Sequence, residues 1–134
     1  NPAVFMYLIQ REKNLSLICT SGQLNLLDHR LIQILLQNPE QGLIYSGDFD
    51  PEGLLIADKI WSGYPNQVQL IGYEKELYQQ ALAEKTISSK RLRQLEKLQN
   101  PQLQEFAKEI QHTKKPGYQE YILYQLYKRF CKLV

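Results

Sequence analysis

GLIYSGDFDPEGLLIADKIWS, residues 42–62, is the stretch of the sequence that decides the fold. Its first part, Gly42–Ser46, is apolar almost throughout and is typical of a strand covered on both faces. Its last part, Pro51–Ser62, is predicted to be a helix, because proline is favoured at the first helical position and Asp50 precedes it as an N-cap. A buried strand followed directly by a helix is typical of a parallel sheet with crossover helices.

The segments on either side repeat this alternation. Helices are predicted over residues 3–11 and 24–37, and strands over residues 15–20 and 67–71. The fold class expected for residues 1–72 is therefore α/β, with a mostly parallel sheet flanked by helices. Because the chain opens on a helix, a first strand is expected to lie before Asn1.

The pattern changes beyond Gly72, where only helices are predicted. They are separated by short breaks, among them Lys114–Gly117, and cover residues 74–84, 88–98, 101–111 and 118–133. We expect residues 73–134 to form a helical extension packed on the same domain.

Composition excludes several classes of protein. The chain has 134 residues, of which 43% are hydrophobic and 22% charged, so it is neither disordered, collagen-like nor a disulfide scaffold. The longest apolar run, Leu54–Ala57, is far too short to cross a membrane. The two cysteines, Cys19 and Cys131, lack the spacing of a zinc site, and with no signal peptide they suggest a cytoplasmic protein. Since the chain begins at Asn1 rather than at Met, we expect it to be a piece of a longer protein.

Charge is distributed unevenly along the chain. Residues 1–84 carry five basic and ten acidic side chains, whereas residues 85–134 carry eleven basic and four acidic ones. A basic half favours a polyanionic partner such as DNA. The densest cationic run either follows a phosphate backbone or is a solvated helix face, and consists of Lys85, Lys90, Arg91, Arg93 and Lys97.

Two carboxylates follow the strand at residues 42–46. Asp48 and Asp50 are two residues apart, so in extended chain their side chains point the same way, at the end of a strand where ligands of α/β sheets bind. Two such charges favour Mg²⁺ or Mn²⁺ between them. Asp50 also has a purely structural interpretation as the N-cap, and Glu52 either reaches the metal or only interacts with the helix dipole.

The motif Gly47–Gly53, GDFDPEG, resembles the DxD-Pro-x-Gly motif of Toprim domains, in the branch of the topoisomerase VI A subunit and its meiotic double-strand-break relatives. Asn1–Phe5 resembles the segment after the Toprim glutamate, and Cys19–Gln23 resembles the glycine-bearing loop after the second Toprim strand. The whole resembles the C-terminal domain of a bacterial family with a topoisomerase-VI-like Toprim domain. The nuclease subunit of the Wadjet plasmid-defence system is a more distant relative.

This resemblance implies Mg²⁺-dependent or Mn²⁺-dependent chemistry on a DNA phosphodiester, of nuclease or topoisomerase-like type. Asp48 and Asp50 would be catalytic metal ligands, with Glu52 as a further candidate. The Toprim glutamate would lie just before Asn1, and partner domains or subunits would supply the attacking tyrosine, so this chain alone is expected to be inactive.

Other residues have both a functional and a structural interpretation. A loop ahead of a predicted helix could donate hydrogen bonds to phosphate or be a plain turn, and consists of Thr20, Ser21, Gly22 and Gln23. Lys59 could touch DNA or be a solvated lysine. Candidate phosphate contacts in the basic half are Lys90, Arg91 and Arg93.

Two other functions remain open. A phosphotransferase of the haloacid-dehalogenase type also places DxD after a strand, but there Gly-Thr or Gly-Val typically follows where this chain has Pro51-Glu52. A non-catalytic Toprim module that only binds nucleic acid or a partner subunit is the other alternative.

Overall fold

The computed structural model describes residues 1–133 and is mixed α/β, with seven α-helices and a two-stranded parallel sheet among those residues. The elements in chain order are α1 (Pro2–Ile9), α2 (Leu26–Leu35), β1 (Leu43–Tyr45), α3 (Pro51–Gly63), β2 (Val68–Leu70), α4 (Lys75–Ala81), α5 (Ser89–Leu92), the 3₁₀ helix η1 (Arg93–Lys97), α6 (Pro101–Thr113), the 3₁₀ helix η2 (Gln119–Ile122) and α7 (Leu123–Cys131). None of these helices is both long and apolar enough to cross a bilayer.

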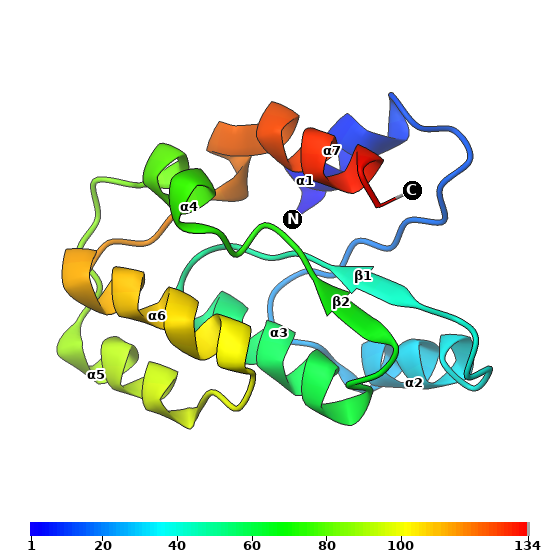
Figure 1. Ribbon diagram of the computed structural model, residues 1–134, viewed down its shortest axis with the longest axis horizontal. Helices are drawn as coiled ribbons and strands as arrows, with labels where there is room; N and C mark the ends of the chain where they lie inside the picture. The colour runs from blue at the N-terminus through cyan, green and yellow to red at the C-terminus, as the bar shows by residue number, and fades with distance from the viewer. Residues whose placement is uncertain (134) are drawn as a thin grey trace.

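The strands β1 and β2 lie in the middle of the molecule (Figure 1). They pair in parallel with Ile44 opposite Gln69, and α3 connects them. Figure 1 shows α1, α4 and α7 along one side of the strands and α2, α3, α5 and α6 along the other. Helices α1 and α7 pack together, although they lie at opposite ends of the chain.

The strand predicted over residues 15–20 is absent. Residues 15–20 form no β-ladder, and within residues 1–133 the only strands are β1 and β2. Side chains in this segment are half-buried or exposed, and Ile18 is half exposed. The prediction was wrong because strand-forming residues give only a local preference, whereas a strand also needs a neighbouring backbone to pair with.

Helix starts follow the capping residues of the sequence. Asp50 accepts a hydrogen bond from the Gly53 N–H at the start of α3, and Asn100 does the same for the Leu103 N–H at the start of α6. Asn25 and Asp28 form a reciprocal capping box at the start of α2. These local bonds satisfy amides that a helix leaves unpaired in its first turn.

One apolar core joins both halves of the sequence. It includes Leu54 and Ala57 of α3 together with side chains of the predicted extension, such as Tyr78, Leu103 and Ile122. The buried carboxylate of Asp58 also connects the two parts, because it accepts hydrogen bonds from the backbone amides of Gln99 and Asn100 just before α6. Both halves of the sequence therefore contribute to the core beneath the loop that follows β1.

Candidate functional site at the end of β1

Phe49 anchors the loop that follows β1. Its side chain is fully buried among Tyr73, Tyr78 and Phe106, with ring centroids 5.4–6.1 Å away. Its backbone N–H donates to the Gly117 carbonyl and its carbonyl accepts from the Gly117 N–H, both at 2.9 Å. Because side chains alternate along an extended backbone, inward-pointing Phe49 directs its two acidic neighbours to the opposite side.

Asp48 is half-buried and held by two donors. Its Oδ1 accepts the backbone N–H of Gln119 at 2.9 Å and the Asn1 side-chain amide at 3.4 Å. Burial raises the pKa of Asp48 above its ordinary value, and the hydrogen bond from Gln119 partly opposes that shift. Within residues 1–133, the second oxygen of this carboxylate accepts no hydrogen bond.

Asp50 caps α3, as one of its two interpretations from the sequence predicted, and it also faces Arg91. Its Oδ1 caps α3 through the Gly53 N–H at 2.7 Å, while its Oδ2 lies 3.4 Å from Arg91 Nη2. Burial raises the pKa of Asp50, and the nearby charges of Glu52 and Asp48 raise it further against the opposing effects of the Gly53 hydrogen bond and Arg91. The charge of Asp48 therefore acts on Asp50, although burial is the larger cause of the shift.

Glu52 is paired with Arg91 of α5. The Arg91 Nε–H is 3.0 Å and 3.2 Å from the two carboxylate oxygens, and the Gln94 amide donates to one of them at 3.2 Å. The hydrogen bond from Arg91 lowers the pKa of Glu52. Arg91, a predicted phosphate contact, thus serves within the protein as the counter-ion of residues 47–53, which we call the acidic loop.

Two tyrosine side chains lie behind the acidic pair. A Cβ placed on Gly47 would lie 3.0 Å from the Tyr45 hydroxyl oxygen and 3.4 Å from that of Tyr73. Burial raises the pKa of Tyr45 to about 12, and the charges of Asp48 and Asp50 act in the same direction. Tyr73 is 4% exposed, and burial raises its pKa well above the ordinary value. Both hydroxyls therefore stay protonated.

The sequence alone did not identify Gln119 or Gly117. Gln119 is 1% exposed, and its side-chain amide donates to Ser46 Oγ at 2.6 Å while its backbone holds Asp48. A Cβ on Gly117 would come within 2.9 Å of the Phe49 ring. The available signal was the Lys114–Gly117 break, which was interpreted only as a connector between helices.

The predicted phosphate loop is not bonded directly to the acidic pair. Within residues 1–133, no hydrogen bond joins Thr20, Ser21, Gly22 or Gln23 to Asp48 or Asp50. Gly22 adopts a φ of 65°, as a glycine turn allows. Gln23 lines a pocket of about 470 Å³ on the surface of α3, together with Lys59 and Gln94.

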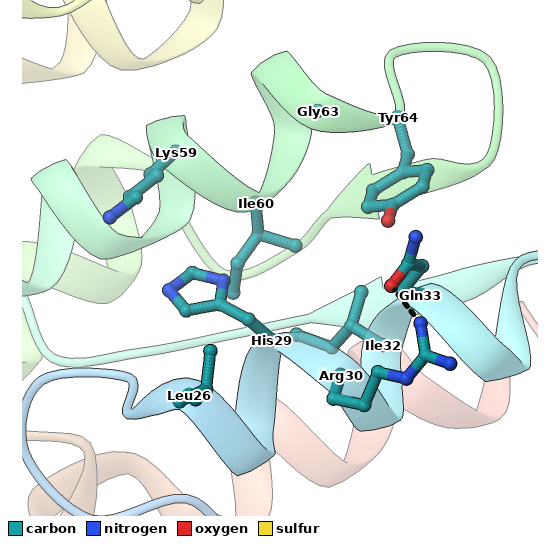
Figure 2. Close-up of a pocket in the computed structure, with 9 residues that line it drawn as sticks. All are labelled: Leu26, His29, Arg30, Ile32, Gln33, Lys59, Ile60, Gly63 and Tyr64. Atoms are coloured by element: carbon teal, nitrogen blue, oxygen red, sulfur yellow. Dashed lines mark hydrogen bonds between the residues drawn. The ribbon is translucent and has the colours of Figure 1, made fainter.

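A second pocket of about 310 Å³ lies between α2 and α3. Figure 2 shows His29 beneath Ile60 in its middle, with Lys59 and Tyr64 toward opposite ends. Lys59 is exposed and lines both pockets. The structure therefore places Lys59 on the helix that starts at the acidic pair, but in a separate surface groove.

The basic run divides into one paired and several exposed cations. Arg91 is engaged with Glu52 and Asp50. Lys90 and Arg93 are exposed and form no ion pair within residues 1–133. Lys90 and Arg93 therefore remain accessible to an external anion, whereas Arg91 must share its hydrogen bonds with the acidic loop.

No group of three or more His, Cys, Asp or Glu side chains suited to hold a metal ion is found in the described part of the chain. The acidic loop contributes two nearby carboxylates, and its third, Glu52, is turned toward Arg91. Water or a bound ligand would therefore supply much of the coordination of any cation held here.

Comparison with known proteins gives one match. The family model described as "Protein of unknown function C-terminus (DUF2399)" matches residues 1–130. No curated protein and no solved structure matches the chain. The family match spans the acidic loop, Arg91 and Gln119 alike, and with almost the entire sequence covered, the chain belongs to the DUF2399 family.

Proposed function

We propose that this chain is a Toprim-type domain that uses Mg²⁺ or Mn²⁺ to act on DNA phosphodiesters. The observation that carries the proposal is the pair of half-buried carboxylates, Asp48 and Asp50, held by backbone amides just beyond a parallel strand. Ligands of open α/β proteins bind at this end of the strands. We infer that the substrate is DNA because the GDFDPEG motif resembles that of Toprim domains and because α5 and η1 carry exposed cations.

The donor set fits a weakly held divalent cation. Asp48 offers a carboxylate oxygen that no described group occupies, and Asp50 Oδ2 faces only Arg91 at a long 3.4 Å. Mg²⁺ is typically bound through one or two carboxylates and keeps several waters. We expect a dissociation constant of about 1 mM, by analogy with metal sites of low ligand charge.

A bound divalent cation would stabilise the negative charge of a phosphoryl group during transfer. Residues of the chain itself fix the loop and the carboxylates that would hold this cation. Phe49 fixes the loop from the core side, Gln119 orients Asp48, and Arg91 reduces the net charge of the acidic loop. Because Arg91 is still partly exposed, its remaining N–H groups can donate to a phosphate oxygen next to Asp50.

A non-catalytic nucleic-acid-binding module is the second candidate function. Glu52 is neutralised by Arg91, and the described residues offer only two acids at the loop. In that case binding would depend on Lys90 and Arg93 and not on a metal.

Metal binding and DNA binding together test the proposal. Water-proton relaxation with Mn²⁺ should report binding by the chain and loss of binding in Asp48→Asn and Asp50→Asn. An asparagine at position 48 keeps an oxygen for the Gln119 N–H, and one at position 50 remains a good N-cap, so each substitution removes charge with little local change. Exposed Glu40, whose carboxylate makes no described hydrogen bond, gives the control Glu40→Gln.

The same variants separate the two candidate functions. Under the proposal, Mn²⁺ strengthens binding of a labelled DNA duplex to the wild-type and Glu40→Gln chains but not to Asp48→Asn. DNA binding that is the same with and without Mn²⁺, and the same in Asp48→Asn, would refute the metal-dependent function and favour the binding module.

A further inference from the structure

We propose that the pocket lined by Gln23, Lys59 and Gln94 on the surface of α3, here called the α3 pocket, binds a single unpaired nucleotide of a DNA strand with Lys59 at its phosphate. The inference rests on the proposed function for the choice of DNA, and it deepens that function by assigning a preference for an unpaired position. The α3 pocket has a volume of about 470 Å³, within the range of about 300–1,000 Å³ that is usual for sites of small ligands.

One face of α3 leads from the acidic loop to this pocket. Glu52, Ile56, Lys59 and Ser62 follow one another at intervals of three or four residues, so they lie on the same side of the helix. Gln94 joins the two places, because it lines the α3 pocket while its side-chain amide donates to Glu52 at 3.2 Å. A strand bound at the acidic loop therefore passes beside the pocket.

The separation suits a strand that occupies both places at once. Residues 55–59 follow Asp50 by five to nine positions, which is about 8–14 Å along a helix that rises about 1.5 Å per residue. One strand of DNA advances about 3.4 Å per nucleotide. The nucleotide in the α3 pocket is therefore about two to four positions away from the phosphate at the acidic pair.

The apolar walls of the pocket suit the flat faces of a base. Leu24, Leu55 and Ile56 line it, and all three are half-buried, so part of their apolar surface stays open to solvent. Proteins that receive a base outside the duplex hold it between aromatic or apolar side chains. A base inside a duplex is stacked on its neighbours and cannot reach such walls. The walls therefore select an unpaired nucleotide.

The polar side chains of the pocket are available to a ligand. Within residues 1–133, the side chains of Gln23, Lys59 and Ser62 make no hydrogen bond or ion pair. A glutamine amide offers both a donor and an acceptor, and a serine hydroxyl can act as either. These groups match the mixed donors and acceptors along the edge of an unpaired base.

Charge at the pocket favours a phosphate beside Lys59. Among the described residues, Asp58 is the one acid that lines the α3 pocket, and its carboxylate is engaged by the backbone N–H groups of Gln99 and Asn100. Figure 2 shows Lys59 at the edge of the neighbouring pocket as well, whose described lining includes Arg30 and no acidic side chain. Exposed Lys59 is therefore the cation placed to pair with the phosphate.

A duplex with one unpaired nucleotide tests the inference. Two labelled duplexes are compared by fluorescence anisotropy with the whole chain in the presence of EDTA, and they differ only in that one carries a single extra, unpaired deoxyadenosine. We expect the chain to bind the bulged duplex about fivefold tighter or more, which is near the lower end of what one base contact contributes. Equal affinity for the two duplexes overturns the inference.

Ser62→Trp fills the pocket without changing any charge. Ser62 is exposed near the end of α3, so the larger side chain does not enter the core. The variant should lose the preference for the bulged duplex and keep the wild-type affinity for the paired duplex and for Mn²⁺. Ser16→Trp, at an exposed position that lines neither pocket, is the matched control and should keep the preference. A preference that survives Ser62→Trp, or that both variants lose alike, overturns the inference.

Lys59→Gln gives a second test that leaves the pocket open. If Lys59 contacts the phosphate of the unpaired nucleotide, the plot of log affinity against log salt becomes less steep by about one unit for the bulged duplex and stays unchanged for the paired one. Equal changes for the two duplexes would show that Lys59 contacts DNA in general, and would overturn the inference.

The outcomes separate this inference from the proposed function. A wild-type chain that binds Mn²⁺ but binds the two duplexes equally overturns the inference and leaves the proposed function intact. A preference for the bulged duplex that Ser62→Trp abolishes, in a chain that binds no Mn²⁺, supports the α3 pocket and refutes the metal-dependent function. A chain that binds neither duplex overturns the inference, whatever its affinity for Mn²⁺.

Discussion

Gly53, in the first turn of α3, has no space for a side chain. A Cβ at this position would lie 2.3 Å from the Asp48 carbonyl oxygen, which is backbone and cannot rotate away. We therefore expect Gly53→Ala to lower the free energy of unfolding by about 1–3 kcal/mol, the usual range for overpacking. Urea denaturation measures the change.

Gly63 gives the opposite prediction in the same helix. A Cβ there has no neighbour within 4 Å, so Gly63→Ala should raise the free energy of unfolding by up to about 1 kcal/mol through helix propensity alone. Equal effects of the two alanines would contradict the close approach at Gly53, and with it the path of the acidic loop.

Tyr45 couples stability to alkaline pH. The unfolded side chain ionises near pH 10, whereas its folded pKa is about 12 because burial and the charges of Asp48 and Asp50 disfavour tyrosinate. The stabilisation is complete below about pH 10 and is lost as the pH rises through 12, about 2–3 kcal/mol in total. Urea unfolding at pH 8 and pH 11 should show the wild-type midpoint approaching that of Tyr45→Phe. A constant gap between the two proteins would contradict the shifted pKa.

At the scale of elements, the arginines of α5 and η1 differ in whether they form an ion pair. Arg93 is exposed and makes no ion pair with a described residue, whereas Arg91 is engaged with Glu52 and Asp50. If this surface binds DNA, Arg93→Gln should reduce the steepness of log affinity against log salt by about one unit, since each phosphate contact contributes about 0.9. Arg91→Gln should reduce it less. Fluorescence anisotropy of a labelled duplex at several salt concentrations measures both slopes.

Exposed Lys13, in the acidic half of the chain, provides the control Lys13→Gln, for which the slope should stay unchanged. Equal losses of about one unit in Arg91→Gln and Arg93→Gln would show that Arg91 leaves Glu52 when DNA binds. That result would contradict the internal counter-ion role given to Arg91 above.

At the scale of the molecule, residues 1–72 and 73–133 share one core, so they should unfold together. Trp61, the only tryptophan, reports on α3, while about half of the α-helical residues, and so about half of the helical circular dichroism, belong to the helices after β2. We expect the fluorescence and circular-dichroism transitions in urea to coincide, as in two-state unfolding. Fully buried Leu103 of α6 contacts the same core, and Leu103→Ala should shift both transitions together by about 2–5 kcal/mol. Two separate transitions would show that the extension is an independent unit.

The sequence predicted most helices because their signals are local. Pro51 with Asp50, Pro101 with Asn100, and the apolar periodicity of residues 24–37 each involve neighbouring residues whose geometry is set within one turn. The strands near residues 44 and 69 were also found, since each is flanked by clear turn and helix signals. The acidic pair was recognisable because spacing in sequence and position after a strand are both visible without a structure.

The remaining features depend on contacts between distant residues. Residues 15–20 have the composition of a strand, yet they form no ladder, because pairing depends on a partner backbone that local composition does not specify. Glu52 and Arg91 are 39 residues apart, and Asp48 and Gln119 are 71 apart, so no local pattern links them. The sequence by itself thus determined where helices begin and which carboxylates follow β1. Only the tertiary structure decided which groups surround those carboxylates, because burial, pairing and charge compensation arise where segments distant in the chain pack together.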